Sequence, residues 1–392
     1  AGDGREHRLM EKELIINRLP AKTWNYLKMN ETHVTAETES IPCTSEIWCV
    51  EKNNAEDAKE NIRTELPDGV GWEKRMLKKD IKTGMGNQMS ELNGQDTADT
   101  LTIEENVHVG CSVVFSYRYD AGKNYGNRMQ ITAGKNSEIE VIFLFTAESN
   151  SSETVMHQLL VDAKEGAKVK IYTAQLLGKN ACAMLDIGGA CEKDASVELL
   201  QIQLGAEKLY AGCLMELDGA HSSFTADIGY FADGNDRYDM NYEARHVGKK
   251  TESRMDADGI LKDSAKKLFR GTIDFIAGCA GAKGAESEDM LLIDENVENQ
   301  TIPLILCGEE DVEGSHGATI GRLDEQMLFY LGSRGFDQEE AKRLVARARI
   351  DALCALIPSE EIQKEIQMLL DHTTGVNSSI PLFMEDETDA WL

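Results

Sequence analysis

The sequence of 392 residues lacks any long apolar run and contains only six prolines. A helix that crosses a bilayer needs about 20 mainly apolar residues, and no stretch of the chain reaches that length. The first 20 residues also lack the apolar segment of a secretory signal peptide. We therefore expect a cytoplasmic protein without a membrane segment. Hydrophobic residues make up 41% of the chain, which suffices for a substantial core.

Positive charge is scarce. The chain has 41 Lys and Arg residues against 69 Asp and Glu residues, which gives a formal net charge of −28. Nucleic-acid phosphates and anionic lipid headgroups would be repelled by such a surface. We therefore expect neither nucleic acid nor membrane as a partner, and solubility is the plain interpretation of the charge.

Paired cysteines are also missing. The chain has nine cysteines, an odd number, and no CxxC motif, so a disulfide framework and a zinc ribbon are both excluded. Small buried thiols in a reducing cytosol are the default interpretation. Cys307 ends an apolar segment and is predicted to lie in the core. Cys279 stands among small residues and is predicted to be exposed, which makes it a weak candidate ligand for iron or an iron–sulfur cluster.

Motifs of several enzyme classes are absent. The chain has no GxxxxGK[ST] sequence for nucleotide phosphates, no HExxH and no GxSxG. The segment 278–284 is rich in glycine but lacks the spacing of a dinucleotide-binding loop. We predict a protein that is not itself an enzyme.

Short apolar and β-branched segments recur between residues 101 and 321, and their length and composition predict strands. The breaks between them repeat loosely as a polar residue, then Gly or Asp, then Ala, at offsets of 28 and 25 residues. A spacing of this kind, without helices in between, favours a β-solenoid over an ordinary β-sandwich. The predicted strands are Val107–Phe115, Ile139–Phe145, Val169–Tyr172, Val197–Ile202, Phe224–Tyr230, Thr272–Ile276, Met290–Ile293 and Ile302–Leu306.

Both flanks of this region are predicted to be helical. Residues 5–30 carry a rough apolar stripe, and residues 51–100 are predicted to form helix and loop. After residue 321, Asp337 is placed to cap a helix whose apolar face includes Leu344 and Ala348. The sequence thus predicts three parts: an N-terminal helical and loop region at 1–100, a β-solenoid core at 101–321 and a C-terminal helical domain at 322–392.

One histidine stands out where the strand pattern gives way to the helical one. His316 lies in a Gly-Ser-His-Gly sequence, and these small neighbours leave its ring uncovered. From the residues alone, a hydrogen-bonded structural histidine is the commoner case. A histidine and a cysteine brought close together would suit iron, but spacing does not establish that they meet.

Several motifs carry a family resemblance. Ser315-His316-Gly317-Ala318-Thr319, followed by Leu328-Phe329-Tyr330-Leu331 and Ser333-Arg334-Gly335, resembles the SufB/SufD family of iron–sulfur cluster assembly scaffolds. Upstream, Leu268-Phe269-Arg270-Gly271, Met290-Leu291-Leu292 and Thr301-Ile302-Pro303 follow the same order. The segment 19–27 resembles the start of SufD-type members.

The resemblance implies a right-handed parallel β-helix between helical ends. It also implies a complex with a SufB-like sister subunit and a SufC-like ATPase, which would supply the ATP hydrolysis. The ATPase would dock on the C-terminal helices, and the residues expected to contact partners are Phe329, Tyr330, Arg334 and Leu344.

The same resemblance favours the SufD subgroup. SufB-type members carry a cysteine near Glu288, where this chain has Glu286-Ser287-Glu288-Asp289. SufD-type members match His316, which makes it the main candidate iron or cluster ligand at a subunit interface. A cysteine is often seen two residues earlier, but this chain has Gly314. A cluster would thus be transient and shared with the partner, and none is expected to be tightly bound in the isolated chain.

Two other interpretations remain open at this point. The chain could be a SufB-like homodimeric scaffold, and a homodimer could also form in isolation through an exposed sheet edge. Alternatively, it could be a β-helix protein without metal chemistry, either structural or carbohydrate-active. A carbohydrate-active enzyme would need Asp and Arg or Lys side chains clustered on one coil face.

Overall fold

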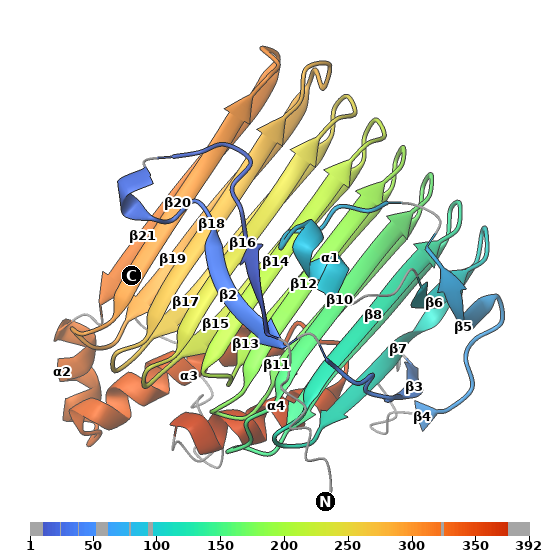
Figure 1. Cartoon of the computed structure of the whole chain (residues 1–392). Coiled ribbons are helices and arrows are strands. Elements are labelled where there is room, and N and C mark those ends of the chain that lie inside the picture. Colours follow the sequence, from blue (N-terminus) through green and yellow to red (C-terminus); the bar gives the residue numbers. More distant parts are fainter. Residues whose placement is uncertain are drawn as a thin grey trace, which may run out of the picture.

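The computed structural model describes residues 11–23, 25–37, 39–51, 62–77, 80–92, 97–322 and 325–374. Its centre is a parallel β-solenoid of about eight turns (Figure 1), which confirms the predicted mainly-β solenoid. Each turn contributes one strand to each of two facing sheets. We call the solenoid strands of these two sheets the even sheet and the odd sheet, after the numbers of those strands.

The strands of the two sheets alternate along the chain, and neighbours within each sheet are parallel. The even sheet consists of β6 (Thr97–Ile103), β8 (Asn124–Ala133), β10 (Thr154–Ala163), β12 (Cys182–Cys191), β14 (Lys208–Leu217), β16 (Arg237–His246), β18 (Lys266–Phe275) and β20 (Glu298–Cys307). The odd sheet consists of β7 (His108–Tyr119), β9 (Glu138–Ala147), β11 (Lys168–Leu176), β13 (Ser196–Leu204), β15 (Ser223–Ala232), β17 (Glu252–Leu261), β19 (Ala282–Leu292) and β21 (Val312–Arg322).

One corner of the solenoid explains the loose sequence repeat. The turn from an even to an odd strand contains one residue with positive φ in coil after coil. Glycine adopts this left-handed conformation freely, and Asn and Asp tolerate it better than most residues. Two of the three predicted breaks contain this positive-φ residue, at Gly166 and Asp194. The third break ends at Ala220, and the positive-φ residue is the next one, His221. The full set is Asn106, Asn136, Gly166, Asp194, His221 and Lys250, with both Gly278 and Gly281 in the turn from β18 to β19.

All eight predicted strand segments lie at least partly within strands, but several other strands were missed, mostly in the even sheet. One reason is glycine within a strand, which argues against strand structure in a sequence. In β12, a Cβ atom on Gly188 would lie 2.7 Å from Thr83, and one on Gly212 in β14 would lie 2.5 Å from the backbone nitrogen of Met85. These glycines allow the segment around residues 82–86 to cross the outer face of the even sheet.

The N-terminal region is mainly β, so the prediction of helix over residues 5–30 is wrong for its described part. A hairpin of β1 (Glu11–Ile16) and β2 (Thr32–Glu37) packs on the even sheet, together with α1 (Asn87–Leu92). The buried guanidinium of Arg270 holds this region by donating to the carbonyl oxygen of Met29 at 2.7 Å and to Asp239 at 2.7 Å. Tertiary contacts therefore override the weak helical pattern. The remaining elements here are η1 (Asn25–Leu27), β3 (Ser45–Glu51), β4 (Ile62–Arg63) and β5 (Val70–Met76).

Three helices follow the solenoid: α2 (Glu325–Ser333), α3 (Gln338–Cys354) and α4 (Glu360–Thr374). The predicted capping box of Asp337 and Glu340 is confirmed. The buried face of α3 includes Ala346 and Ile350, whereas Leu344 is half-buried and Ala348 is exposed, so the predicted apolar face is partly wrong. Residues 375–392 of the predicted C-terminal domain lie outside the described residues.

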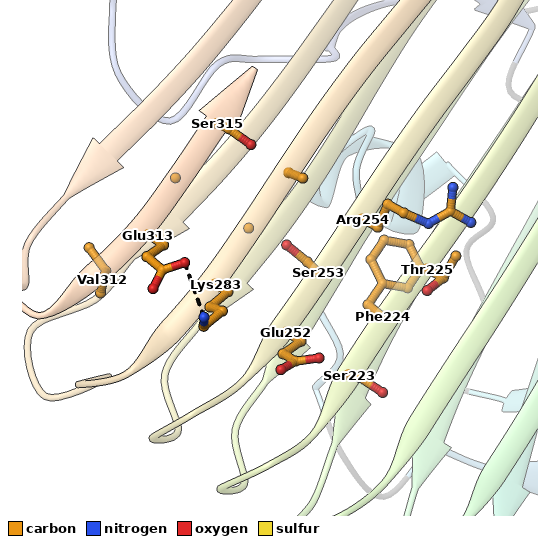
Figure 2. Close-up of a pocket in the computed structure, with 13 residues that line it drawn as sticks. Ser223, Phe224, Thr225, Glu252, Ser253, Arg254, Lys283, Val312, Glu313 and Ser315 are labelled. Carbon is orange, nitrogen blue, oxygen red and sulfur yellow. Dashed lines mark hydrogen bonds and ion pairs between the residues drawn. The ribbon is translucent and has the colours of Figure 1, made fainter. Parts of the chain in front are cut away.

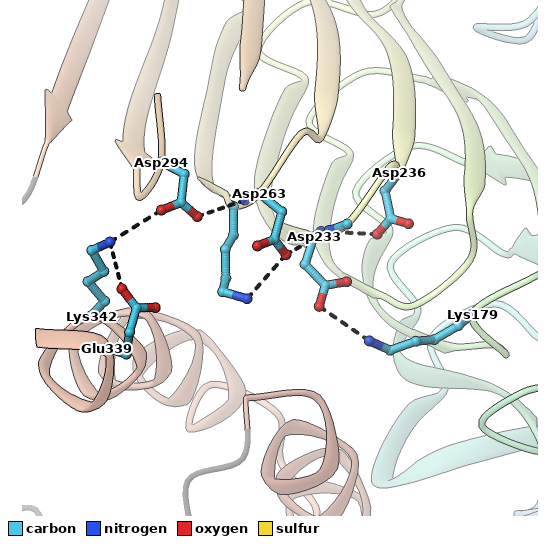
Figure 3. Close-up of polar contacts among 9 residues, drawn as sticks. Lys179, Asp233, Asp236, Asp263, Asp294, Glu339 and Lys342 are labelled. Atoms are coloured by element: carbon cyan, nitrogen blue, oxygen red, sulfur yellow. Dashed lines mark hydrogen bonds and ion pairs between the residues drawn. The ribbon is translucent and has the colours of Figure 1, made fainter. Parts of the chain in front are cut away.

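Helices α3 and α4 are packed on the outer face of the odd sheet, where they form a second apolar core. A polar contact anchors the start of α3 to the corners of the solenoid: the ammonium of Lys342 lies 3.2 Å from Asp294 and 2.9 Å from Glu339 (Figure 3). Asp294 in turn accepts from the backbone nitrogen of Asp263 in the preceding coil at 2.8 Å. Helix α3 is thus tied to two successive coils. Among the described residues, none of the helices is long and apolar enough to span a membrane.

Candidate functional site

The two ends of the solenoid differ. At the first coil, β5 pairs antiparallel with β6, and β3 pairs antiparallel with β7. At the last coil, no strand within the described ranges pairs with the outer edges of β20 and β21. An unpaired edge presents a row of backbone donors and acceptors that can pair with another chain. We call the end formed by β20 and β21 the open end.

His316 lies in the middle of β21 at the open end, and its side chain is exposed. The sequence interpretation placed it beside a strand-to-helix switch, but β21 continues to Arg322. Its register partner in β19 is Glu286, and paired residues of neighbouring parallel strands face the same side of a sheet. Because Glu286 points into the solenoid, His316 occupies the corresponding interior-facing position in a coil that no described strand covers.

Glu286 is buried directly beneath this position. Only 3% of the residue is exposed, and neither carboxylate oxygen has a hydrogen-bond partner among the described residues. Its carboxyl group reaches across the interior to Gly271 on β18, where a Cβ atom would lie 2.7 Å from the carboxyl carbon. Burial, and next the charge of Glu288, raise the pKa of Glu286 to about 7 against the opposing effect of Lys267.

Glu288, the next interior-facing residue of β19, has partners for its carboxylate. It forms a fully buried ion pair with Lys267 of β18 and accepts from the Thr301 hydroxyl at 2.5 Å and from the Tyr230 hydroxyl at 3.2 Å. The sequence analysis named Glu286 and Glu288 only as the place where a SufB-type cysteine is absent, and it missed Lys267. The signal was available, because Glu286, Glu288 and Met290 follow the period of two that places residues on one face of a strand.

Both predictions about cysteine exposure at this end are wrong. Cys307 is exposed, because β20 is the last strand of its sheet and no further coil covers it. Cys279 is buried in the main core, in the turn between β18 and β19, and burial raises the pKa of its thiol. A buried thiol with a raised pKa is a poor metal ligand, since the thiolate is the form that binds metal.

The residues of the open end make at most a partial metal site. No group of three or more His, Cys, Asp or Glu side chains with a metal-binding arrangement occurs in the part of the chain that the structure describes. Gly314 leaves no thiol near His316, and a Cβ atom there would lie 3.0 Å from Phe275 and 3.1 Å from Ile305. Any metal held at His316 would therefore need further donors from outside this chain or from the bound species.

A second exposed feature is the helix that follows the open end. On α2, Phe329 is 80% exposed and Tyr330 is 55% exposed. The guanidinium carbon of Arg334 lies 5.2 Å from the centre of the Tyr330 ring, a cation–π distance. Leu344 lies on α3 and is only half-buried. We call Phe329, Tyr330 and Arg334 the α2 patch.

A groove of about 800 Å³ runs over β15, β17, β19 and β21 at the start of these strands (Figure 2). Three of the four charged side chains that line it already form ion pairs. Lys283 lies 3.0 Å from Glu313, and Arg254 lies 3.0 Å from Asp227 and also contacts Asp256. Of the charged residues that line the groove, only Glu252 lacks an ion pair within the described residues, and the open end remains the stronger candidate site.

Glu243 of β16 is a useful reference for Glu286. It is 6% exposed, and burial, followed by the charge of Asp274, raises its pKa to about 7. The carboxyl group keeps its proton in the folded chain between pH 4.5 and 7, whereas it ionises at about 4.5 in the unfolded chain. The stability that the protonated Glu243 side chain contributes is therefore complete below pH 4.5 and is lost as the pH rises towards 7.

We expect Glu243→Gln to remove this pH dependence. The variant should match the wild type near pH 4 and exceed its free energy of unfolding by up to about 3 kcal/mol at pH 8. Urea unfolding at pH 4, 6 and 8 measures the difference. A constant difference between the two proteins over this range would contradict the assigned titration.

Comparison with known proteins identifies a matching family and several relatives. The family described as "SUF system FeS cluster assembly, SufBD core domain" matches residues 117–349. An iron–sulfur cluster assembly SufBD family protein of Mycobacterium leprae is 24% identical over 276 residues, which are 69% of this chain and 32% of that protein.

Two relatives of Bacillus subtilis represent both branches of the family. The iron–sulfur cluster assembly protein SufD is 32% identical over 126 residues, which are 32% of this chain and 29% of SufD. The corresponding SufB is 25% identical over 232 residues, which are 58% of this chain and 49% of SufB. The chain thus spans about a third to a half of the length of these three relatives. The family match covers more than half of the chain and the whole central part of the solenoid, and we conclude that this chain belongs to the SufBD family of SUF iron–sulfur cluster assembly proteins.

Proposed function

We propose that this chain is a SufD-like scaffold subunit that works with a SufB-like sister subunit and a SufC-like ATPase. The observation that carries the proposal is the open end, where no described strand pairs with the outer edges of β20 and β21 and where β21 carries the exposed His316. A sister solenoid can pair with these edges through backbone hydrogen bonds, as extended segments do in β-augmentation. Residues from both subunits would then surround His316.

Three features favour the SufD-like role over the SufB-like one. Glu288 stands close to the place where SufB-type members carry a cysteine, and its carboxylate is occupied by Lys267 and Thr301. The one cysteine exposed near the open end, Cys307, lies at the end of β20 and was not matched to a family motif. The resemblance of segment 19–27 to SufD-type members points the same way.

His316 would act as an iron ligand during assembly. Neutral imidazole binds iron through one ring nitrogen, and the other nitrogen can be oriented by a neighbouring acceptor. Iron and sulfide are the cargo of such a scaffold, so the site must bind them and release them again. An incomplete set of donors on each subunit suits this task, because separating the subunits would remove part of the ligand set.

The test is assembly of the complex from purified proteins. We expect the full chain to form a stable complex with a SufB-like subunit, with a mass measured by light scattering equal to one copy of each. If the chain instead remains a homodimer in the presence of the SufB-like subunit, the SufB-like homodimeric scaffold becomes the better interpretation. A variant with Ala318→Pro in β21 should weaken the complex, because the register places the Ala318 N–H on the open edge and proline removes that donor.

The α2 patch is the proposed contact for the ATPase. Exposed aromatic and arginine side chains are the residue types that dominate binding energy at interfaces. Phe329→Ala should raise the Kd for a SufC-like ATPase by about tenfold to thirtyfold without changing thermal stability. Tyr26→Ala is the matched control, since Tyr26 is 75% exposed and lies in the N-terminal region. Equal affinity of the Phe329 variant and the wild type in a titration would refute the docking site.

A further inference from the structure

The buried carboxylate of Glu286 has no structural role that its surroundings explain. Ionised or neutral, a buried carboxyl group costs free energy when its oxygens lack partners, and native structures contain few of them. Glu288, two residues away on the same face of β19, has three partners. Glu286 has none among the described residues.

The space around Glu286 is shaped to hold its carboxyl group. The group reaches the opposite sheet at Gly271, where any side chain would collide with it. One coil further, the register partners of these two residues are His316 and Pro303. The carboxylate therefore lies in the last covered coil, and the histidine lies directly above it in the open coil. Neighbouring strands are about 4.8 Å apart, so two interior-facing side chains at paired positions can reach one ion.

We propose that Glu286 and His316 together form a binding site for a ferrous ion at the open end of the solenoid. This inference rests on the proposed role of His316 and adds a second ligand from the same chain. One carboxylate and one imidazole are a donor pair that suits Fe(II). The remaining coordination positions face the open end, where sulfide, water or donors from the sister subunit would complete the site.

The neighbouring charges fit this assignment. Lys267 is the nearest cation, but it forms a buried ion pair with Glu288 and also donates to Thr301 at 3.0 Å. It therefore does not neutralise Glu286. A divalent cation would supply the missing partner for both carboxylate oxygens. Cys307 and Cys279 are not needed, which agrees with the burial of Cys279.

The experiment measures binding of Fe(II) alone to the isolated full chain under anaerobic conditions, by equilibrium dialysis at pH 7.5. Co(II) serves as a spectroscopic substitute, because its visible absorption reports nitrogen and oxygen coordination. The variants are Glu286→Gln, His316→Ala and Glu243→Gln. The last removes an equally buried carboxyl group from β16 and is the matched control. Circular dichroism and thermal unfolding verify that each variant is folded.

We expect Glu286→Gln to weaken Fe(II) binding by about tenfold or more and to change the Co(II) spectrum, since loss of even a supporting residue of a metal site costs about 10- to 100-fold. Glu243→Gln should bind within twofold of the wild type. A second variant, Gly271→Ala, should weaken binding without removing a ligand, because its methyl group displaces the Glu286 carboxyl group.

The outcomes separate this inference from the proposed function. Wild-type Fe(II) affinity in Glu286→Gln would overturn the inference. If His316→Ala loses binding in the same series, the role of His316 stands without Glu286. If both variants bind like the wild type, the isolated chain holds no ferrous site at the open end and both ligand assignments fail. The Co(II) spectrum of the wild type reports whether nitrogen and oxygen ligands bind the ion, even if a variant does not fold.

Discussion

His316→Ala is expected to abolish cluster assembly by the complete complex while leaving the chain folded. The side chain is exposed in the last strand of the solenoid and makes no contribution to the core, so its loss should change the thermal unfolding midpoint little. Loss of a ligand from a site that already lacks a full donor set should lower the rate of cluster formation by about 100-fold. The measurement is anaerobic reconstitution with iron and sulfide in the presence of the SufB-like and SufC-like subunits, followed by visible absorption.

The matched control is His108→Ala. His108 is another exposed histidine of an odd-sheet strand, but it lies at the start of β7 in the first coil, where its imidazole is 3.5 Å from Glu138. It should support assembly at the wild-type rate. Normal cluster formation by His316→Ala would rule out the proposed ligand role, and equal losses in both variants would indicate a general effect of surface histidines.

Lys267→Met is expected to cause the largest loss of stability of any substitution considered. Lys267 and Glu288 have no exposed side-chain surface, and removal of the ammonium leaves Glu288 as an uncompensated buried charge. Breaking a buried ion pair in this way costs about 3–5 kcal/mol. The hydroxyl groups of Thr301 and Tyr230 would still donate to Glu288 and reduce the loss somewhat. Urea unfolding at pH 7 measures the effect.

A double-mutant cycle provides the control for this prediction. Lys267→Met combined with Glu288→Leu removes both charges, so the double variant should be more stable than Lys267→Met alone by about 2 kcal/mol or more. Lys283→Met breaks an exposed pair with Glu313 in the adjacent coil and should cost less than about 1 kcal/mol. If the double variant is no more stable than the single one, the buried charge is not the source of the loss.

The open end links these two predictions. Lys267 and Glu288 stabilise the last covered coil from within, and His316 lies in the coil above them. A strand edge that pairs with a sister subunit, as we propose for β21, needs a rigid support, because fraying of β19 would disturb the register of β21. The buried ion pair supplies a fixed contact between the two sheets at the level where the interface begins.

Local chemistry made part of the architecture predictable. Val, Ile and Phe side chains in segments such as Ile139–Phe145 predicted strands, and Asp337 with Glu340 predicted the start of α3 correctly. The repeated breaks pointed to a solenoid because one residue in each coil must turn through a left-handed conformation. These features depend on a residue and its near neighbours in the sequence, so a reader of the sequence can see them.

Other predictions failed because the deciding contacts are distant in sequence. The N-terminal hairpin is held by Arg270, which lies more than 200 residues away, and no local pattern contains that contact. Cys279 and Cys307 exchanged their expected environments because burial depends on whether another coil follows. Gly188 argued against a strand in the sequence, yet it permits a second segment to cross that strand.

The sequence by itself thus determined the family, the repeating strands and the identity of His316 as the residue to examine. Only the tertiary structure decided that His316 belongs to an open terminal strand and that Glu286 lies buried beneath it without a partner. The physical reason is that the side of the sheet to which a side chain points follows from local alternation along the strand. Its burial and its partners depend instead on which strands lie beside it.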